Sequence, residues 1–190
     1  QAFTNFGLST SSVREIALAV NSKDPQKLTI AVNVSRRMMW LSGLLGAGIT
    51  FTLAPMLSYQ AFGGGKYTVA FIWLSVTLLL NQISEGQLAV LQGLRKFNYL
   101  ARSNIIGSSF GLITAIPLYY VYGLDGIVPS IVLTSLTMLL ITKMYLRKDN
   151  VNKIQLTLTE LIYRGRKLLS LGFLINMSGL IGLGSIYVFR

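Results

Sequence analysis

The stretch MMWLSGLLGAGITFTLAPMLSYQAFGGG, residues 38–65, decides the fold because it runs for 28 residues without a charged side chain. In an α-helix, about 20 apolar residues are enough to cross the roughly 30 Å hydrocarbon core of a bilayer. An uncharged run of this length is typical of a membrane span and not of a core helix in a soluble domain. The stretch therefore predicts a transmembrane helix.

Similar uncharged stretches recur along the chain, at 67–84, 103–124, 126–142 and 168–189, each 17 to 22 residues long. A shorter one occupies residues 1–13. Together they predict one partial and five full spans, at about 1–20, 36–58, 67–93, 99–121, 124–146 and 168–190. The predicted fold class is all-α, a polytopic transmembrane helix bundle.

The composition agrees with a lipid environment and disfavours most enzymes. Hydrophobic residues make up 52% of the chain and charged residues 12%, about half the charged share of a soluble domain. Cysteine and histidine are absent, which excludes disulfides, thiolate chemistry, zinc sites with those ligands and Ser-His nucleophiles. We therefore expect a protein that is not an enzyme, with no cofactor and no bound metal.

The net charge of +11 is distributed unevenly, which predicts the orientation. Fourteen of the 17 Lys and Arg residues fall in segments 21–37, 95–102 and 143–167, which share one side of the membrane if the spans alternate. Basic loops normally stay in the cytoplasm and contact anionic inner-leaflet lipids. We expect a multi-pass membrane protein whose basic loops lie in the cytoplasm and which does not bind nucleic acid.

Local signals predict where helices begin and end. Asp24-Pro25 combines a capping carboxylate with proline at the first helical position, and the glycines of 63–65 and 122–126 predict tight turns. Residues 154–168 begin with a capping-box pattern at 157–160 and carry apolar residues at helical spacing. We interpret this segment as an amphipathic helix on the inner membrane surface, the alternative being a plain basic linker.

A few polar residues fall inside the predicted spans, and these are the candidates for a functional site: Arg14, Glu15, Asn81, Gln82 and Glu85. Counting 1.5 Å per residue back from Lys23 and Arg95 puts Arg14 about 13 Å and Glu85 about 15 Å into the membrane. Ionised side chains at such depths usually face a partner or water. The residues therefore predict a water-filled cavity open to the cytoplasm. The alternative is that the charged groups of α-helix 1–20 snorkel to the interface and Glu85 belongs to a packing network.

Four motifs give the chain a family resemblance. They are SSVREIA at 11–17, GQLAVLQGLRK at 86–96, IPLYY at 116–120 with GIVP at 126–129, and KLLSLGF at 167–173. In this order they resemble the bacterial O-antigen translocases, the Wzx-type flippases of the multidrug/oligosaccharidyl-lipid/polysaccharide exporter superfamily. These are hydrophobic family motifs and not catalytic signatures.

The resemblance implies a transporter of two six-helix lobes, of which this chain is an internal piece. Residues 1–146 would belong to the first lobe, from its second helix onward, 147–167 to a cytoplasmic amphipathic linker, and 168–190 to the first helix of the second lobe. Such proteins move undecaprenyl-diphosphate-linked oligosaccharides, the repeat units of O-antigen and related polysaccharides, across the inner membrane by alternating access. Arg14 and Arg190 match charged positions thought to meet the substrate.

Three alternatives stay open at this point. A multidrug or lipid II exporter of the same superfamily would use the same fold, although drug exporters favour acidic cavities. A membrane-embedded polysaccharide polymerase would need a larger external loop than the short ones predicted here. A helical scaffold subunit would have a dry interior. The coupling ion, proton or sodium, and contacts with other polysaccharide assembly proteins also stay open.

Overall fold

The computed structural model describes residues 7–147 and 158–188, and within these ranges the chain is helical without strands. Its α-helices are α1 (Leu8–Asn21), α2 (Pro25–Phe62), α3 (Thr68–Gly93), α4 (Phe97–Tyr122), α5 (Ile127–Arg147) and α6 (Leu158–Val188). Two short 3₁₀ turns, η1 (Gly65–Tyr67) and η2 (Gly123–Gly126), join α2 to α3 and α4 to α5. The predicted all-α fold is confirmed.

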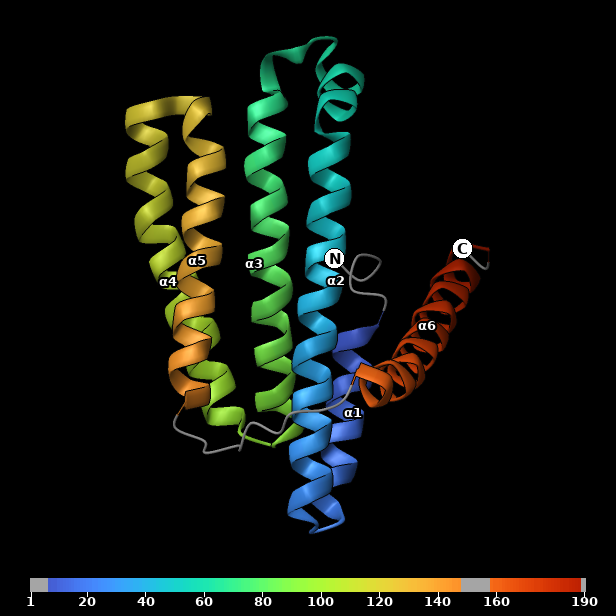
Figure 1. Ribbon diagram of the computed structural model, residues 1–190. Helices are drawn as coiled ribbons and strands as arrows, with labels where there is room; N and C mark the ends of the chain where they lie inside the picture. The colour runs from blue at the N-terminus through green and yellow to red at the C-terminus, as the bar shows by residue number, and fades with distance from the viewer. Residues whose placement is uncertain (1–6, 148–157, 189–190) are drawn as a thin grey trace.

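Helix α3 is the centre of the bundle, because it packs against α1, α2, α4 and α5. Figure 1 shows α3 between α2 and α5, with α1 and α4 behind them. Helix α6 contacts α1 and α2 and then rises away from the other helices. The bundle is therefore a layer of antiparallel helices with α6 attached at one flank.

Four helical segments are long and apolar enough to cross a membrane: Pro25–Phe62, Gly65–Gly93, Phe97–Tyr122 and Ile127–Arg147. They confirm a helical membrane protein. Large apolar side chains are exposed along them, as lipid contact requires, among them Leu44, Leu45, Ile49, Phe51, Ile105, Leu112, Ile113, Ile116 and Leu140. Exposed tyrosines lie at one end of these helices, where they fit a membrane interface: Tyr59, Tyr67, Tyr119, Tyr120 and Tyr122.

The helix connections alternate between the two ends of the bundle (Figure 1). The turns at 22–24 and 94–96 lie at one end, and the glycine turns at 63–67 and 123–126 lie at the other. We call the first the basic end, because it carries Lys23, Arg95, Lys96 and Arg147. The alternation assumed in counting the loop charges is confirmed, while the cytoplasmic location of the basic end stays a prediction.

The predicted start of α2 is confirmed. The Asp24 carboxylate accepts hydrogen bonds from the backbone N–H groups of Gln26 (2.9 Å) and Lys27 (3.4 Å), and Pro25 is the first helical residue. At the neighbouring turn, the Arg95 guanidinium donates to the Asn21 amide oxygen at 3.0 Å. A side-chain hydrogen bond therefore joins the two turns of the basic end.

Helix α2 is longer than a bilayer is thick. Its 38 residues extend about 57 Å, nearly twice the hydrocarbon core. Residues 25–37, which carry three of its basic side chains, precede the uncharged stretch that begins at Met38. Figure 1 shows this segment and α1 projecting together past the ends of α3, α4 and α5. We call the part of the bundle level with the uncharged stretch of α2, from Met38 onward, the apolar band. The α1–α2 hairpin (8–37) therefore extends beyond this band.

Packing contacts show where α1 lies along this hairpin. Ile16 is buried in one cluster with Val32, Val90 and Leu91. Val32 is six residues before Met38, about 9 Å outside the uncharged part of α2. The second half of α1 consequently lies beside the projecting segment, while the predicted span at 1–20 stays a prediction. Residues 1–6 lie outside the described part of the chain.

The start of α6 also differs from the prediction of a separate surface helix. Helix α6 is continuous from Leu158 to Val188, with no break at the predicted boundary of 167 and 168. Leu161 and Leu168 are buried in a cluster with residues of α1 and α2. Gly165 between them lies against Met38, where a larger side chain would clash. The apolar face of this segment therefore packs on the hairpin. The predicted cap at 157 and the linker residues 148–157 lie outside the described residues.

The close contact between α1 and α3 yields a testable prediction. A Cβ atom on Gly93 would lie 2.7 Å from the Ile16 side chain and 3.2 Å from the Val13 carbonyl oxygen. Gly93→Ala should therefore destabilise the fold by about 1–3 kcal/mol through overpacking. The measurement is the midpoint of thermal unfolding of the detergent-solubilised protein.

The matched control is Gly46→Ala in α2, where no atom lies within 4 Å of the added Cβ. This variant should unfold at the wild-type temperature or slightly above it, since alanine favours helix over glycine. Equal midpoints for the two variants would contradict the close α1–α3 packing.

Candidate functional site

A stripe of polar side chains follows one face of α3. Asn81, Glu85, Leu88 and Gln92 are spaced by four, three and four residues, which places them on one side of a helix. All are half-buried or exposed, whereas the residues around them on the other faces of α3 are buried, including Gln82, Ile83, Ser84, Gly86, Ala89 and Val90. We call Asn81, Glu85 and Gln92 the α3 polar stripe.

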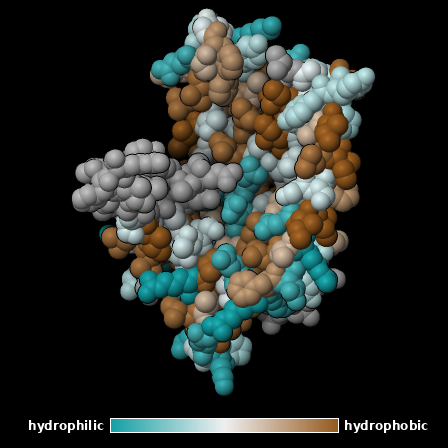
Figure 2. Space-filling view, turned by 180° about the vertical axis from the view of Figure 1, so that it is seen from behind, coloured by the Kyte–Doolittle hydropathy of each residue, from teal (hydrophilic) through white to brown (hydrophobic). Residues whose placement is uncertain are grey.

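The side of the bundle seen from behind also carries polar groups. Figure 2 shows polar side chains gathered at mid-height and at the basic end of this face, below a largely apolar region. Helix α4 adds two exposed polar residues, Asn104 and Ser108. Because the chain reverses at 94–96, these lie near the height of Glu85 and Asn81. Helices α3 and α4 therefore both carry polar groups at this height.

The height of the stripe follows from a contact between α3 and α2. Gly86 lies directly against the Met39 side chain, at the start of the uncharged part of α2. Glu85 is therefore at the edge of the apolar band, Asn81 lies about 6 Å farther inside and Gln92 about 10 Å outside. The stripe thus leads from the basic end into the membrane region.

Glu85 stands out within this stripe. It is half-buried, and residues 7–147 and 158–188 offer it neither a hydrogen bond nor an ion pair. A carboxylate at the edge of a hydrocarbon layer is costly unless it contacts water or a partner. Glu85 must therefore be hydrated or bound by a group outside the described helices.

Arg14 is exposed on α1 and lies lower than predicted. The atoms closest to a Cβ on Gly93 belong to Ile16 and Val13, so Arg14 is level with Gly93, about 12 Å along the helix axis from Glu85. The prediction of equal depth is wrong because Lys23, from which the depth was counted, lies at the tip of the projecting hairpin. Arg14 lies about 200° around α1 from Ile16, the side chain that packs on α3, so Arg14 points away from α3 and into the surroundings.

Gln82 has a structural role on the face of α3 that packs on α2. Its side-chain amide donates to the Ser42 hydroxyl at 3.0 Å and lies 3.5 Å from the Met39 sulfur. The prediction that Gln82 lines a cavity with Asn81 is wrong. Consecutive residues of a helix point about 100° apart, so Gln82 faces α2 when Asn81 does not.

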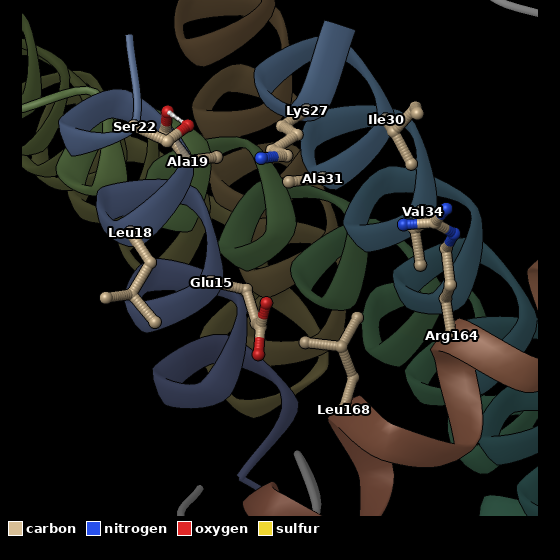
Figure 3. A pocket seen from close by; sticks show the side chains of 10 residues that line it. All are labelled: Glu15, Leu18, Ala19, Ser22, Lys27, Ile30, Ala31, Val34, Arg164 and Leu168. Atoms are coloured by element: carbon tan, nitrogen blue, oxygen red, sulfur yellow. Dashed lines mark hydrogen bonds between the residues drawn. The ribbon is translucent and has the colours of Figure 1, made fainter. Parts of the chain in front are cut away.

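Glu15 lies in a pocket that the sequence did not predict as a unit. This α1–α2–α6 pocket has a volume of about 300 Å³ and brings Glu15 of α1 close to Lys27 of α2 and Arg164 of α6 (Figure 3). No sequence motif connects Lys27 with Arg164. They line one pocket only because α6 packs on the α1–α2 hairpin. Arg190, the remaining candidate, lies outside the described residues.

The described residues contain no cluster of His, Asp or Glu that could hold a metal ion. A comparison with protein-family models, with curated proteins and with solved structures finds no match. The functional argument consequently depends on the α3 polar stripe, Arg14 and the pocket.

The exposure of the stripe can be tested by cysteine labelling, since the chain has no native cysteine. We expect Glu85→Cys to react with a water-soluble thiol reagent in the membrane-embedded protein, because this position is uncovered and polar. Gln82→Cys should stay unlabelled, because its position is closed by α2.

A lipid-facing position provides a second control. Leu112→Cys on α4 is exposed in the middle of the candidate span Phe97–Tyr122, where lipid should cover it, so the same reagent should not reach it. Equal protection of positions 85 and 112 would show that the stripe is dry and would favour a scaffold subunit.

Proposed function

We propose that this chain is part of a flippase that moves an undecaprenyl-diphosphate-linked oligosaccharide across a bacterial inner membrane. It would contribute most of one helical lobe and the first helix of a second lobe. The observation that carries the proposal is the α3 polar stripe, whose half-buried to exposed side chains lead from the basic end of the bundle into the apolar band. The family resemblance of the four sequence motifs supports the same function.

The physical requirement of such a substrate matches this arrangement. A diphosphate sugar cannot cross about 30 Å of hydrocarbon unless polar groups replace its water. Asn81 and Gln92 offer amide donors and acceptors for sugar hydroxyls, while exposed Arg14 of α1 lies near the basic end, level with Gly93, where a diphosphate would arrive. The stripe would thus form one wall of a cavity that a second lobe closes, and rocking of the lobes would expose it to each side in turn.

A second function is favoured by Glu85 alone. A carboxylate at the edge of the apolar band suits a cationic compound or a coupling proton or sodium ion better than it suits a diphosphate. In an exporter of cationic drugs, Glu85 would bind the substrate. In the flippase, it would serve the coupling ion. Glu85→Gln separates the two, because it should abolish drug binding in the first case and only gradient dependence in the second.

The proposed contact of Arg14 with the diphosphate predicts how transport depends on this residue. In the full-length protein reconstituted into vesicles, Arg14→Ala should abolish translocation of the lipid-linked oligosaccharide, because the cation that meets the diphosphate is lost. Membrane insertion and thermal stability should stay at the wild-type level, since the Arg14 side chain is exposed and packs against no neighbouring helix.

The control is Arg147→Ala, which removes another exposed arginine from the same end of the bundle, at the end of α5. It should transport normally. Normal transport by the Arg14→Ala variant, or equal loss in both variants, would contradict a specific role of Arg14 and would leave only the general effect of basic charge.

A further inference from the structure

The α1–α2–α6 pocket lies on the flank of α1 that faces α2 and α6, away from the α3 polar stripe. Its walls come from the projecting hairpin and from the start of α6, and it holds about 300 Å³, at the lower end of the size of small-molecule sites. Figure 3 shows the Glu15 carboxylate, the Lys27 amine and the Arg164 guanidinium around this space, each from a different helix. A ligand here would contact all three helices.

The charges of the pocket are nearly balanced. Two cations face one carboxylate, but Lys27 also forms an ion pair with Asp24, its nitrogen lying 3.7 Å from the Asp24 oxygen. A second acid thus offsets the second cation. A ligand with both a negative and a positive group complements such a site better than a simple anion, because Glu15 and Asp24 repel additional negative charge.

The remaining lining is apolar and lies close to the membrane surface. Leu18, Val34 and Leu168 form part of the wall. Val34 is four residues before Met38, so it lies about 6 Å outside the apolar band, within the head-group layer of roughly 5–7 Å on each side of a bilayer. Leu18 is itself exposed at the pocket. The pocket therefore opens where phospholipid head groups lie and offers apolar surface beside its charges.

We propose that this pocket binds the phosphoethanolamine head group of a membrane phospholipid. The phosphate lies between Lys27 and Arg164, which supply charge-assisted donors, and the ammonium group donates to the Glu15 carboxylate. Phosphatidylglycerol lacks the ammonium group, and phosphatidylcholine lacks its N–H donors. The bound lipid joins α6 to the α1–α2 hairpin and so stabilises the angle at which α6 leaves the bundle.

Native mass spectrometry of the full-length protein tests this. The detergent-solubilised protein is mixed with equal amounts of phosphatidylethanolamine, phosphatidylglycerol and phosphatidylcholine, and the lipid retained on the folded protein is identified. We expect phosphatidylethanolamine to be retained about tenfold over the other two, as one charge-assisted hydrogen bond allows. Equal retention of the three lipids would overturn the proposal.

Variants assign the retained lipid to the pocket. Arg164→Gln should lower retention of phosphatidylethanolamine about tenfold, and Arg164→Lys should restore most of it. Glu15→Gln, which keeps the side-chain shape, should remove the preference over phosphatidylglycerol. Only variants that elute at the wild-type volume in size-exclusion chromatography, and are therefore folded, are compared. If Arg164→Gln does not fold, the lipid preference of Glu15→Gln alone tests the proposal.

Two further outcomes would overturn the proposal. Arg147→Gln removes a basic residue of the same end that does not line the pocket, so a loss equal to that of Arg164→Gln would show general charge attraction. Soluble phosphoethanolamine is the second probe. Displacement of the lipid by an equal concentration of this compound would show a site for a free phosphate compound and not for a lipid.

Discussion

The exclusion of water from the apolar band is the constraint on which the rest of the structure depends. Backbone amides in this layer can be satisfied only within helices, and charged side chains are tolerated only where they reach water or a partner. Helices α2 to α5 meet the first condition with four apolar segments. The second condition requires water or a partner for Glu85, which lies at the edge of this layer without a partner in the described part of the chain.

The basic end is built differently, because there α1 and α2 continue beyond the layer. The hairpin buries Ile16 and Val32 together and receives Leu161 and Leu168 of α6. Helix α6 is therefore attached outside the apolar band and leaves the bundle as it rises (Figure 1). A contact made at the membrane surface thus controls the direction of the helix that would begin a second lobe.

Helix α1 carries a candidate residue on two of its faces. Arg14 is exposed near the basic end, while Glu15, the next residue, lines the α1–α2–α6 pocket. Their directions differ by about 100° because they are adjacent on a helix. A lipid held by Glu15 and Arg164 would therefore act on the same short helix that presents Arg14, which physically connects the pocket to the proposed transport face.

The sequence by itself determined the apolar band, the capped start of α2 at Asp24 and the basic end, because these features depend on residues close together in the chain. It also identified Asn81 and Glu85 as polar groups that need an explanation. Only the tertiary structure decided that Gln82 packs on α2, that Arg14 lies below Glu85 and that Lys27 and Arg164 line one pocket. The reason is that periodicity describes the faces of one helix, whereas the neighbour on each face and the offset between helices depend on side-chain packing, such as that of Gly93 on Ile16.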